Sequence, residues 1–344
     1  SGGRHALAFL LATLAHGLRF SSERQDLHDA SDREVMLQMS ALSPHAELNE
    51  SASSVVTASR GLPNQEAFAS RWRWYNEQVD IDRLERELEI HSKMDRRITI
   101  VMGVFSIASA EERPFRDVVR STWMQYPGVC RLEPHARTWS RGCTVHATFV
   151  LGSDSFDSTG EDDLTILPIE ENMDRGKSRL WFWRASKTWA WATHVAKMDL
   201  DAFPKFSPIL AALRSHDPPC KNMYGGTMIA ACGSHPYYPP CGCGAPVDAD
   251  FLKYNVTDDR ECFSYMQGGF YFITRELAAS AAKPGEWWDT DTRANCYPED
   301  VTAGHAITRY GKDNNVCVQA LSFGPEQAAW HTPGSIRPWT GCHG

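Results

Sequence analysis

The sequence lacks the features that would carry it across a membrane or onto a nucleic acid. Its longest apolar run, residues 6–15, is about half the length that a bilayer-spanning helix needs. No basic stretch is long enough to follow a phosphate backbone, and the formal net charge is −8, which argues against a nucleic-acid partner. No internal repeat is present, which argues against a repeat architecture.

Cysteine is missing from the first 129 residues and then occurs ten times. This even number, with Asn-x-Ser/Thr sequons at Asn49 and Asn255, predicts an oxidising secretory compartment, glycosylation at both asparagines and a disulfide-rich C-terminal half. Two alternatives stay open, a reduced cytosolic protein with buried thiols and a zinc site. The zinc site is disfavoured because Cys241 and Cys243 are separated by one residue and no histidine pair follows.

Composition divides the chain into three segments. Residues 1–61 are predicted to be a stem or linker, since 21–61 are rich in Ser, Ala, Asp, Glu and His with little periodicity. Residues 62–95 are predicted to hold a stem helix, because Leu84, Leu88 and Ile90 recur among charged residues. Two roles are open for this helix, docking on the domain that follows and forming a homodimer. Residues 96–344 are predicted to be a single catalytic domain.

Within this domain, apolar runs alternate with helical patterns. Continuous apolar runs predict strands at 98–106, 145–152, 164–167 and 193–199, as in strands buried on both faces of a sheet. Helices are predicted between them at 113–124 and 176–193. Later elements are a helix at 206–214, a loop-rich stretch at 215–262, a strand at 269–274, a helix at 275–282 and a strand at 317–321. The alternation predicts an α/β fold with a mostly parallel sheet.

An acidic pair, Asp199 and Asp201, lies where the fourth predicted strand ends. In open α/β sheets ligands sit beyond the carboxyl ends of the strands. Carboxylates at that edge suit Mg²⁺ or Mn²⁺, which can in turn hold a diphosphate. Three other acidic-x-acidic pairs begin at Asp80, Asp248 and Asp289. They are predicted to lie on the solvated surface. Its position after a buried strand makes the pair at 199 and 201 the preferred metal site.

Six segments between residues 98 and 331 occur in the order found in the β1,3-glycosyltransferase family. They resemble that family's motifs at 116–123 (RDVVRSTW), 149–152 (FVLG), 172–178 (NMDRGKS), 197–201 (KMDLD), 265–272 (YMQGGFYF) and 299–304 (EDVTAG). The Asn-Met-x-x-Gly-Lys variant in the third segment is most similar to the kinetoplastid branch. Members of that branch add side-chain sugars to surface phosphoglycans.

The resemblance implies a Rossmann-like GT-A fold and inverting, metal-dependent transfer of a hexose from a nucleotide sugar. UDP-galactose is the favoured donor and a phosphoglycan hydroxyl the acceptor, as in a β1,3-galactosyltransferase. It also implies a type II membrane protein of the Golgi lumen whose anchor precedes this chain. Two alternatives stay open, an arabinosyltransferase that uses GDP-arabinose and a non-catalytic secreted carbohydrate-binding protein. Leu200 stands where relatives carry a third acid, which leaves the donor open.

The resemblance also assigns metal and catalytic roles. Asp201 is expected to be a direct ligand of Mn²⁺ or Mg²⁺, with Asp199 reaching the ribose or the metal through water. His331 is expected to complete the metal site, and His305 is the alternative. Asp300 is expected to be the base that takes the acceptor proton. A helix start at this position is compatible with that role, since acids there favour the helix dipole.

Substrate contacts are implied for two groups of residues. The expected donor contacts are Arg116, Arg120, Thr122, Lys177, Asp199, Gly268 and Gly269. The expected acceptor contacts are Trp287, Trp288 and Glu299. Each group has a structural alternative: ion pairs for the arginines, a solvated surface for the lysine and core packing for one of the two tryptophans.

Overall fold

The computed structural model describes residues 64–94, 97–133, 135–153, 160–215, 221–229, 263–295 and 297–331. Contacts divide the chain into two units, residues 1–57 and 58–344, and every described residue belongs to the second. The predicted stem or linker at 1–61 and both sequons, at Asn49 and Asn255, lie outside the described residues.

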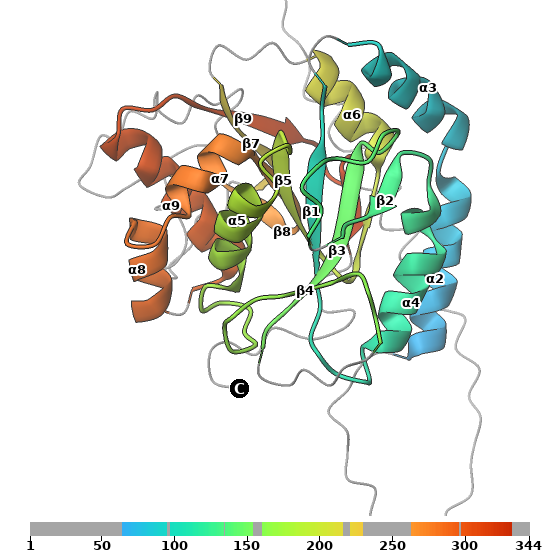
Figure 1. Ribbon diagram of the computed structural model, residues 1–344, viewed down its shortest axis with the longest axis horizontal. Helices are drawn as coiled ribbons and strands as arrows, with labels where there is room; N and C mark the ends of the chain where they lie inside the picture. Colours follow the sequence, from blue (N-terminus) through green and yellow to red (C-terminus); the bar gives the residue numbers. More distant parts are fainter. Residues whose placement is uncertain are drawn as a thin grey trace, which may run out of the picture. The chain divides into compact units, whose positions relative to one another are not determined.

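The described residues form an eight-stranded sheet (Figure 1). Its strands are β1 (Ile100–Phe105), β2 (Val129–Arg131), β3 (Val145–Leu151), β4 (Leu164–Ile166), β5 (His194–Asp199), β7 (Asn222–Ile229), β8 (Tyr265–Thr274) and β9 (Val318–Phe323). The order is β2-β3-β1-β5-β8-β7-β9, and β4 pairs with β3. Five of the seven pairings are parallel, and β8 runs antiparallel to both β5 and β7. The prediction of an α/β fold with a mostly parallel sheet is confirmed.

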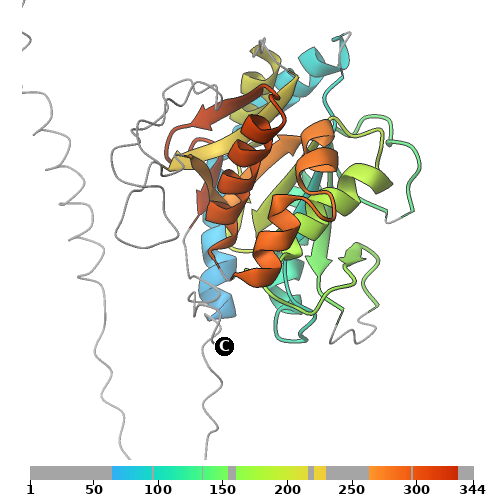
Figure 2. The same cartoon turned by 90° about the vertical axis from the view of Figure 1, so that its left-hand side faces the viewer.

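Helices cover both faces of this sheet. One face is covered by α2 (Gln65–Gln78), α3 (Ile81–Ser92), α4 (Arg113–Ser121) and α6 (Phe206–Ser215). The other is covered by α5 (Lys177–Thr188), α7 (Arg275–Ala281), α8 (Trp287–Ala294) and α9 (Glu299–Asp313), and Figure 2 looks onto this face. Alternate residues of β1 reach the two sides: Met102 packs in the first core and Val101 in the second. Burial on both faces explains why the parallel strands are continuous apolar runs.

The predicted stem helix is two helices. The chain leaves α2 at Val79 in an extended conformation, and Asp80 caps α3 by accepting a hydrogen bond from the Arg83 backbone N–H at 2.8 Å. Helix α2 packs on α4, and α3 packs on α6. Leu84 and His91 are buried in the second of these contacts, and the His91 ring is hydrogen-bonded to the Leu210 carbonyl at 2.9 Å.

Four short or irregular strands, β2, β6 (Ala202–Pro204), β7 and β10 (Ala329–His331), were not predicted. Strand β7 lies inside the stretch predicted to be loop, where Gly225 and Gly226 mask its pattern. The strands β6 and β10 pair antiparallel in a separate two-stranded sheet. In that sheet His331 is opposite Ala202, which brings the end of the described chain to the end of β5.

Disulfides are present in the part of the chain that the structure describes. Cys130 and Cys143 are joined, and Cys317 is also disulfide-bonded. The remaining cysteines lie outside the described residues, so a disulfide-rich C-terminal half is not supported. No helix in the described ranges is both long enough and apolar enough to cross a membrane.

Candidate metal and donor site

Two carboxylates and one imidazole meet at the carboxyl edge of the parallel strands. Asp199 ends β5, Asp201 precedes β6, and β10 places His331 beside them. Nε2 of His331 lies 3.7 Å from a carboxylate oxygen of Asp199 and 3.4 Å from one of Asp201. One potential ligand atom from each residue lies within 4.8 Å of the others. It is therefore His331, rather than the alternative His305, that the fold brings to the acidic pair.

The electrostatics of this cluster favour a cation. Burial raises the pKa of Asp199, and the charge of Asp201 raises it further against the pull of Lys197. Burial alone lowers the pKa of His331, but its contact with Asp201 and the charge of Asp199 outweigh burial and raise it. The Nδ1 atom of His331 is buried without a hydrogen-bond partner among the described residues.

Two carboxylates and an imidazole nitrogen form a donor set that fits Mn²⁺, or Mg²⁺ with water completing the shell, and it leaves the identity of the metal open. A bound divalent ion would offset the repulsion between the two carboxylates, which the neighbouring imidazole offsets only in part.

The absence of a side chain at Gly269 leaves room for the imidazole of His331. Asp199 follows Met198, which pairs with Phe270 of β8, so Gly269 lies beside the end of β5. A Cβ at Gly269 would lie 2.5 Å from Nδ1 of His331, a distance that no side chain tolerates. The contact of Gly269 with a donor remains a prediction. In this structure Gly269 makes room for the ring of His331, because it has no side chain.

A buried lysine joins the metal cluster to α9. The Nζ atom of Lys197 lies 2.7 Å from Asp199 Oδ1, donates to the Gly268 carbonyl at 2.6 Å and pairs with Glu299. Burial by itself lowers the pKa of Lys197, but the charges of Asp199 and Glu299 outweigh it and keep the pKa raised. Lys197 is 1% exposed, so the ammonium group is a fixed charge between β5, β8 and α9.

Glu299 is saturated by donors from three elements. One of its oxygens pairs with Lys197, and the other accepts from Ser178 Oγ at 2.7 Å and from the Tyr271 hydroxyl at 2.9 Å. The residue is buried. Its expected contact with an acceptor stays a prediction, and the geometry assigns it to holding Lys197 and the start of α9.

Asp300 occupies the first turn of α9, next to Gly268 of β8. Its carboxylate accepts from the Gly268 backbone N–H at 2.9 Å and from the Val301 N–H at 2.8 Å. Burial and the neighbouring charge of Glu299 raise the pKa of Asp300 to about 7, although Lys197 and the two N–H groups act in the opposite direction. A carboxylate of this kind can hold or release a proton near neutral pH, as a general base does.

The two arginines of α4 are occupied by ion pairs. Arg116 is fully buried, and its Nε and Nη2 donate to Glu161 at 2.9 and 2.6 Å, while Nη1 donates to Ser106 and to the Ile107 carbonyl. Arg120 pairs in the same way with Asp163 at 2.9 and 2.7 Å.

These contacts are the structural alternative to donor binding. The Thr122 hydroxyl is likewise taken up by the Val118 carbonyl, at 2.8 Å, where α4 ends. A donor contact by any of these three residues stays a prediction.

Lys177 begins α5 beside the end of β1. Its Nζ donates to the Ser106 carbonyl at 2.7 Å and to Glu171 at 2.6 Å, and the residue is 1% exposed. Burial lowers its pKa, and the charge of Glu171 opposes that effect. The solvated-surface alternative is therefore wrong, and contact with a diphosphate would require Lys177 to exchange one of its present partners.

The two tryptophans of α8 have different surroundings. Trp288 is 1% exposed and packs against Phe182 in the core. This corrects the prediction that Trp288 binds an acceptor, because a buried indole offers no face to a sugar. Trp287 is half-buried against His305, which also stacks on Phe263. These contacts hold His305 away from the metal cluster.

Lys197, Ser178 and Tyr271 were not assigned functional roles from the sequence. A role for Lys197 could have been predicted, because it is the charged residue within an otherwise apolar strand. A charge buried in this way needs a partner of opposite charge. Ser178 and Tyr271 had none, since hydroxyls on buried elements are common.

Comparison with known proteins adds little to this picture. No family model and no curated protein matches the sequence, so the resemblance to β1,3-glycosyltransferases gains no support from sequence comparison. A solved structure, the inositol-1-phosphate CTP transferase from T. maritima, is 13% identical over a match that covers 70% of this chain and 92% of that one. The TM-score is 0.31, and at that value the likeness carries no conclusion about activity.

Proposed function

We propose that this protein is a metal-dependent transferase that takes a sugar from a nucleotide donor, and in particular an inverting galactosyltransferase acting on a glycan hydroxyl. The observation that carries the proposal is the Asp199, Asp201 and His331 cluster at the carboxyl edge of the sheet. Ligands of open α/β sheets bind at this edge. The segment 197–201, which resembles the Lys-x-Asp-Asp-Asp motif of the β1,3-glycosyltransferases, supplies two of these three residues, which supports the finer assignment.

The residues of the chain supply the acid–base chemistry. In an inverting transfer the acceptor hydroxyl attacks the sugar carbon as the bond to the nucleotide diphosphate breaks, so the hydroxyl proton needs a base. Asp300 is the proposed base, because its raised pKa lets it take that proton near neutral pH. Gly268 orients the carboxylate through its backbone N–H. When bound by Asp199, Asp201 and His331, the metal would neutralise charge on the leaving diphosphate.

Two buried lysines lie at the same edge of the sheet. Lys197 and Lys177 both lie near Phe105, with their Nζ atoms 5.4 and 5.1 Å from its ring centre. Fixed charges in a site of low dielectric stabilise developing negative charge without reorganising. We infer that they favour binding of a diphosphate at the end of β1 and β5.

The decisive experiment is nucleotide binding by the full chain with and without Mn²⁺. We expect Mn²⁺ together with UDP to raise the melting temperature, and Asp201→Asn to remove that response. The matched control is Asp82→Asn, which changes an exposed member of another acidic-x-acidic pair and should leave the response intact.

The outcome also distinguishes the donors. A response to GDP in place of UDP would support the arabinosyl alternative with a GDP-arabinose donor. No Mn²⁺-dependent response to either nucleotide would overturn the proposal and leave a non-catalytic carbohydrate-binding protein as the better account.

The cellular setting belongs to the same proposal. The Cys130–Cys143 disulfide and the bonded Cys317 are compatible with an oxidising compartment such as the Golgi lumen, where glycans are extended. A phosphoglycan acceptor fits that setting.

A further inference from the structure

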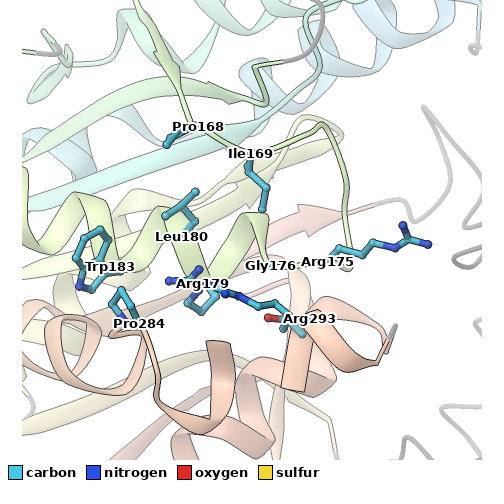
Figure 3. Close-up of a pocket in the computed structure, with 10 residues that line it drawn as sticks. Pro168, Ile169, Arg175, Gly176, Arg179, Leu180, Trp183, Pro284 and Arg293 are labelled. Carbon is cyan, nitrogen blue, oxygen red and sulfur yellow. The ribbon is translucent and has the colours of Figure 1, made fainter. Parts of the chain in front are cut away.

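A separate pocket of about 380 Å³ lies between α5, α8 and the loops that precede α5 and α8 (Figure 3). Its walls include Ile169, Gly176, Arg179, Trp183, Pro284 and Arg293. The volume is within the range of about 300–1,000 Å³ that is usual for small-molecule sites. None of the residues assigned above to metal binding or acid–base chemistry lines it.

Arg179 is a buried cation with spare hydrogen-bonding capacity. The residue is 6% exposed; Nη2 lies 2.6 Å from Asp289, and Nη1 donates to the Ala282 carbonyl at a long 3.5 Å. Its Nε–H has no hydrogen-bond partner among the described residues. Leaving such a donor unpaired in a buried place is costly, so the guanidinium has capacity for a further acceptor.

The positive charge around the pocket exceeds its described counter-charge. Arg179 and Arg293 share one carboxylate oxygen of Asp289, at 2.6 and 2.9 Å, and the other oxygen accepts from the Gly285 N–H at 2.9 Å. Figure 3 shows Arg293 next to Arg179, while Arg175 extends away from them. Two guanidinium groups on one carboxylate leave an excess positive charge that a bound anion would balance.

The start of α5 adds to this preference for an anion. Gly176 lines the pocket and is the N-cap residue of α5, and as a glycine it supplies no side-chain cap to the N–H groups of the first turn. The N-terminus of a helix carries a partial positive charge and free N–H donors. Arg179 belongs to that first turn, so helix terminus and guanidinium both favour an anion.

The opposite end of the pocket is apolar. Trp183 and Pro284 lie next to each other there (Figure 3), with Leu180 close by in the wall. A half-buried indole and a proline ring offer flat apolar surfaces, on which the C–H face of a sugar ring packs well. A ligand that fills the pocket would therefore carry an anion at one end and a compact body with an apolar face at the other.

We propose that this pocket binds the phosphate ester of a sugar, with the phosphate on Arg179 and Arg293 and the sugar against Trp183 and Pro284. Bidentate contacts with arginine are a common mode of phosphate recognition. The site is distinct from the metal cluster: Ser178 of α5 donates to Glu299 at that cluster, whereas Gly176 and Arg179 line the pocket.

Calorimetric titration of the full chain tests the proposal, in EDTA and without nucleotide, so that the result does not depend on the metal site. The probes are mannose 6-phosphate, galactose 1-phosphate, inorganic phosphate, and mannose and galactose without a phosphate group. We expect a Kd below about 1 mM for at least one sugar phosphate, weaker binding of phosphate and none of the neutral sugars. Arg293→Gln, at a side chain that is 69% exposed, should weaken binding about tenfold.

Two further variants make the result decisive. Arg179→Lys keeps a charge near Asp289 but removes the planar fork, and it should abolish binding while circular dichroism stays unchanged. Arg86→Gln on α3 removes the same kind of charge from an exposed position and should bind as the unaltered protein does. Binding of a sugar phosphodiester as well as the monoester would identify a glycan chain as the source, and binding of the monoester alone a free sugar phosphate.

Failure of all sugar phosphates to bind would overturn the proposal, as would equal affinity in Arg293→Gln and the unaltered protein. If Arg179→Lys does not fold, the Arg293 comparison decides alone. Because these titrations contain neither metal nor nucleotide, their failure would leave the proposed transferase activity untouched.

Discussion

At the scale of single residues, Asp300 combines two properties that few carboxylates share. It is half-buried with two backbone donors, yet its pKa is raised to about 7 from an ordinary value of 3.8. Burial is the main cause, and the adjacent charge of Glu299 adds to it. The folded protein therefore binds a proton at Asp300 over a pH range in which the unfolded chain has released it.

This proton linkage predicts how Asp300→Asn changes stability. Between about pH 4 and pH 7 the folded state holds more protons at Asp300 than the unfolded state does. The contribution of Asp300 to the free energy of unfolding therefore falls as pH rises through this range and is constant above it. The Asp300→Asn variant does not lose stability in this way. The difference in the free energy of unfolding, variant minus unaltered protein, should therefore increase from pH 5 to pH 8. Urea unfolding at both pH values measures the difference, in EDTA to exclude metal effects. A difference that is the same at both pH values would contradict the raised pKa.

The same substitution tests the proposed base. Asn cannot accept the hydroxyl proton, so kcat for transfer should fall by about 10²–10⁴-fold while nucleotide affinity stays unchanged. Near-normal turnover in Asp300→Asn would remove it from that role.

At the scale of elements, the imidazole of the metal cluster depends on a helix at the other end of the described chain. Trp330 neighbours His331 in β10 and stacks on Tyr75 of α2, with ring centres 4.8 Å apart and planes 5° apart. Phe203 of β6 packs on both rings, and Lys205 Nζ lies 3.6 Å over Trp330. This aromatic stack holds β10 against β6 and so fixes the position of His331.

Tyr75→Ala should therefore weaken metal binding without touching a ligand. We expect it to lower stability by about 1–2 kcal/mol, as for loss of a half-buried aromatic contact, and to lower Mn²⁺ affinity several-fold. Tyr75→Phe preserves the stack and is the matched control for both. Urea unfolding and calorimetry with Mn²⁺ provide the measurements. Lost stability with unchanged Mn²⁺ affinity would show that α2 has no part in the metal site.

The sequence predicts elements and site to different degrees, and the reason is physical. Strands β1, β3 and β5 are buried on both faces, so their composition alone reveals them. Strands β6 and β10 have three residues each and exist because they pair with one another across more than a hundred residues. No local pattern encodes such a pairing. Asp199 and Asp201 could therefore be predicted as a site from the sequence. The role of His331 was predicted only from the family resemblance, and the contact of Tyr75 with β10 was not predicted.

At the scale of the whole unit, β8 is the one antiparallel strand of the described sheet, and it lies between β5 and β7. Lys197 lies where β5 meets β8, and its partners are Asp199 of β5, the Gly268 carbonyl of β8 and Glu299 of α9. It had no predicted role, because its partner Glu299 is distant in sequence. A buried charge pair contributes little net stability but is costly to break, which makes it a specific lock on the relative placement of three elements.

A double-mutant cycle on Lys197→Met and Glu299→Gln tests this lock. Lys197→Met leaves the buried carboxylate of Glu299 without its counter-charge and should cost about 3 kcal/mol or more of unfolding free energy. Glu299→Gln leaves Lys197 paired with Asp199 alone and should cost less. The double variant should cost less than the sum by at least about 1 kcal/mol, because the second change removes a charge that the first has already orphaned. The matched control is the exposed pair Lys93 and Glu89, where the same substitutions should couple by under about 0.5 kcal/mol. Urea unfolding measures all four free energies, and additive costs at the buried pair would mean that Lys197 and Glu299 stabilise their elements independently, so that the metal cluster and the base on α9 are not held together by this contact.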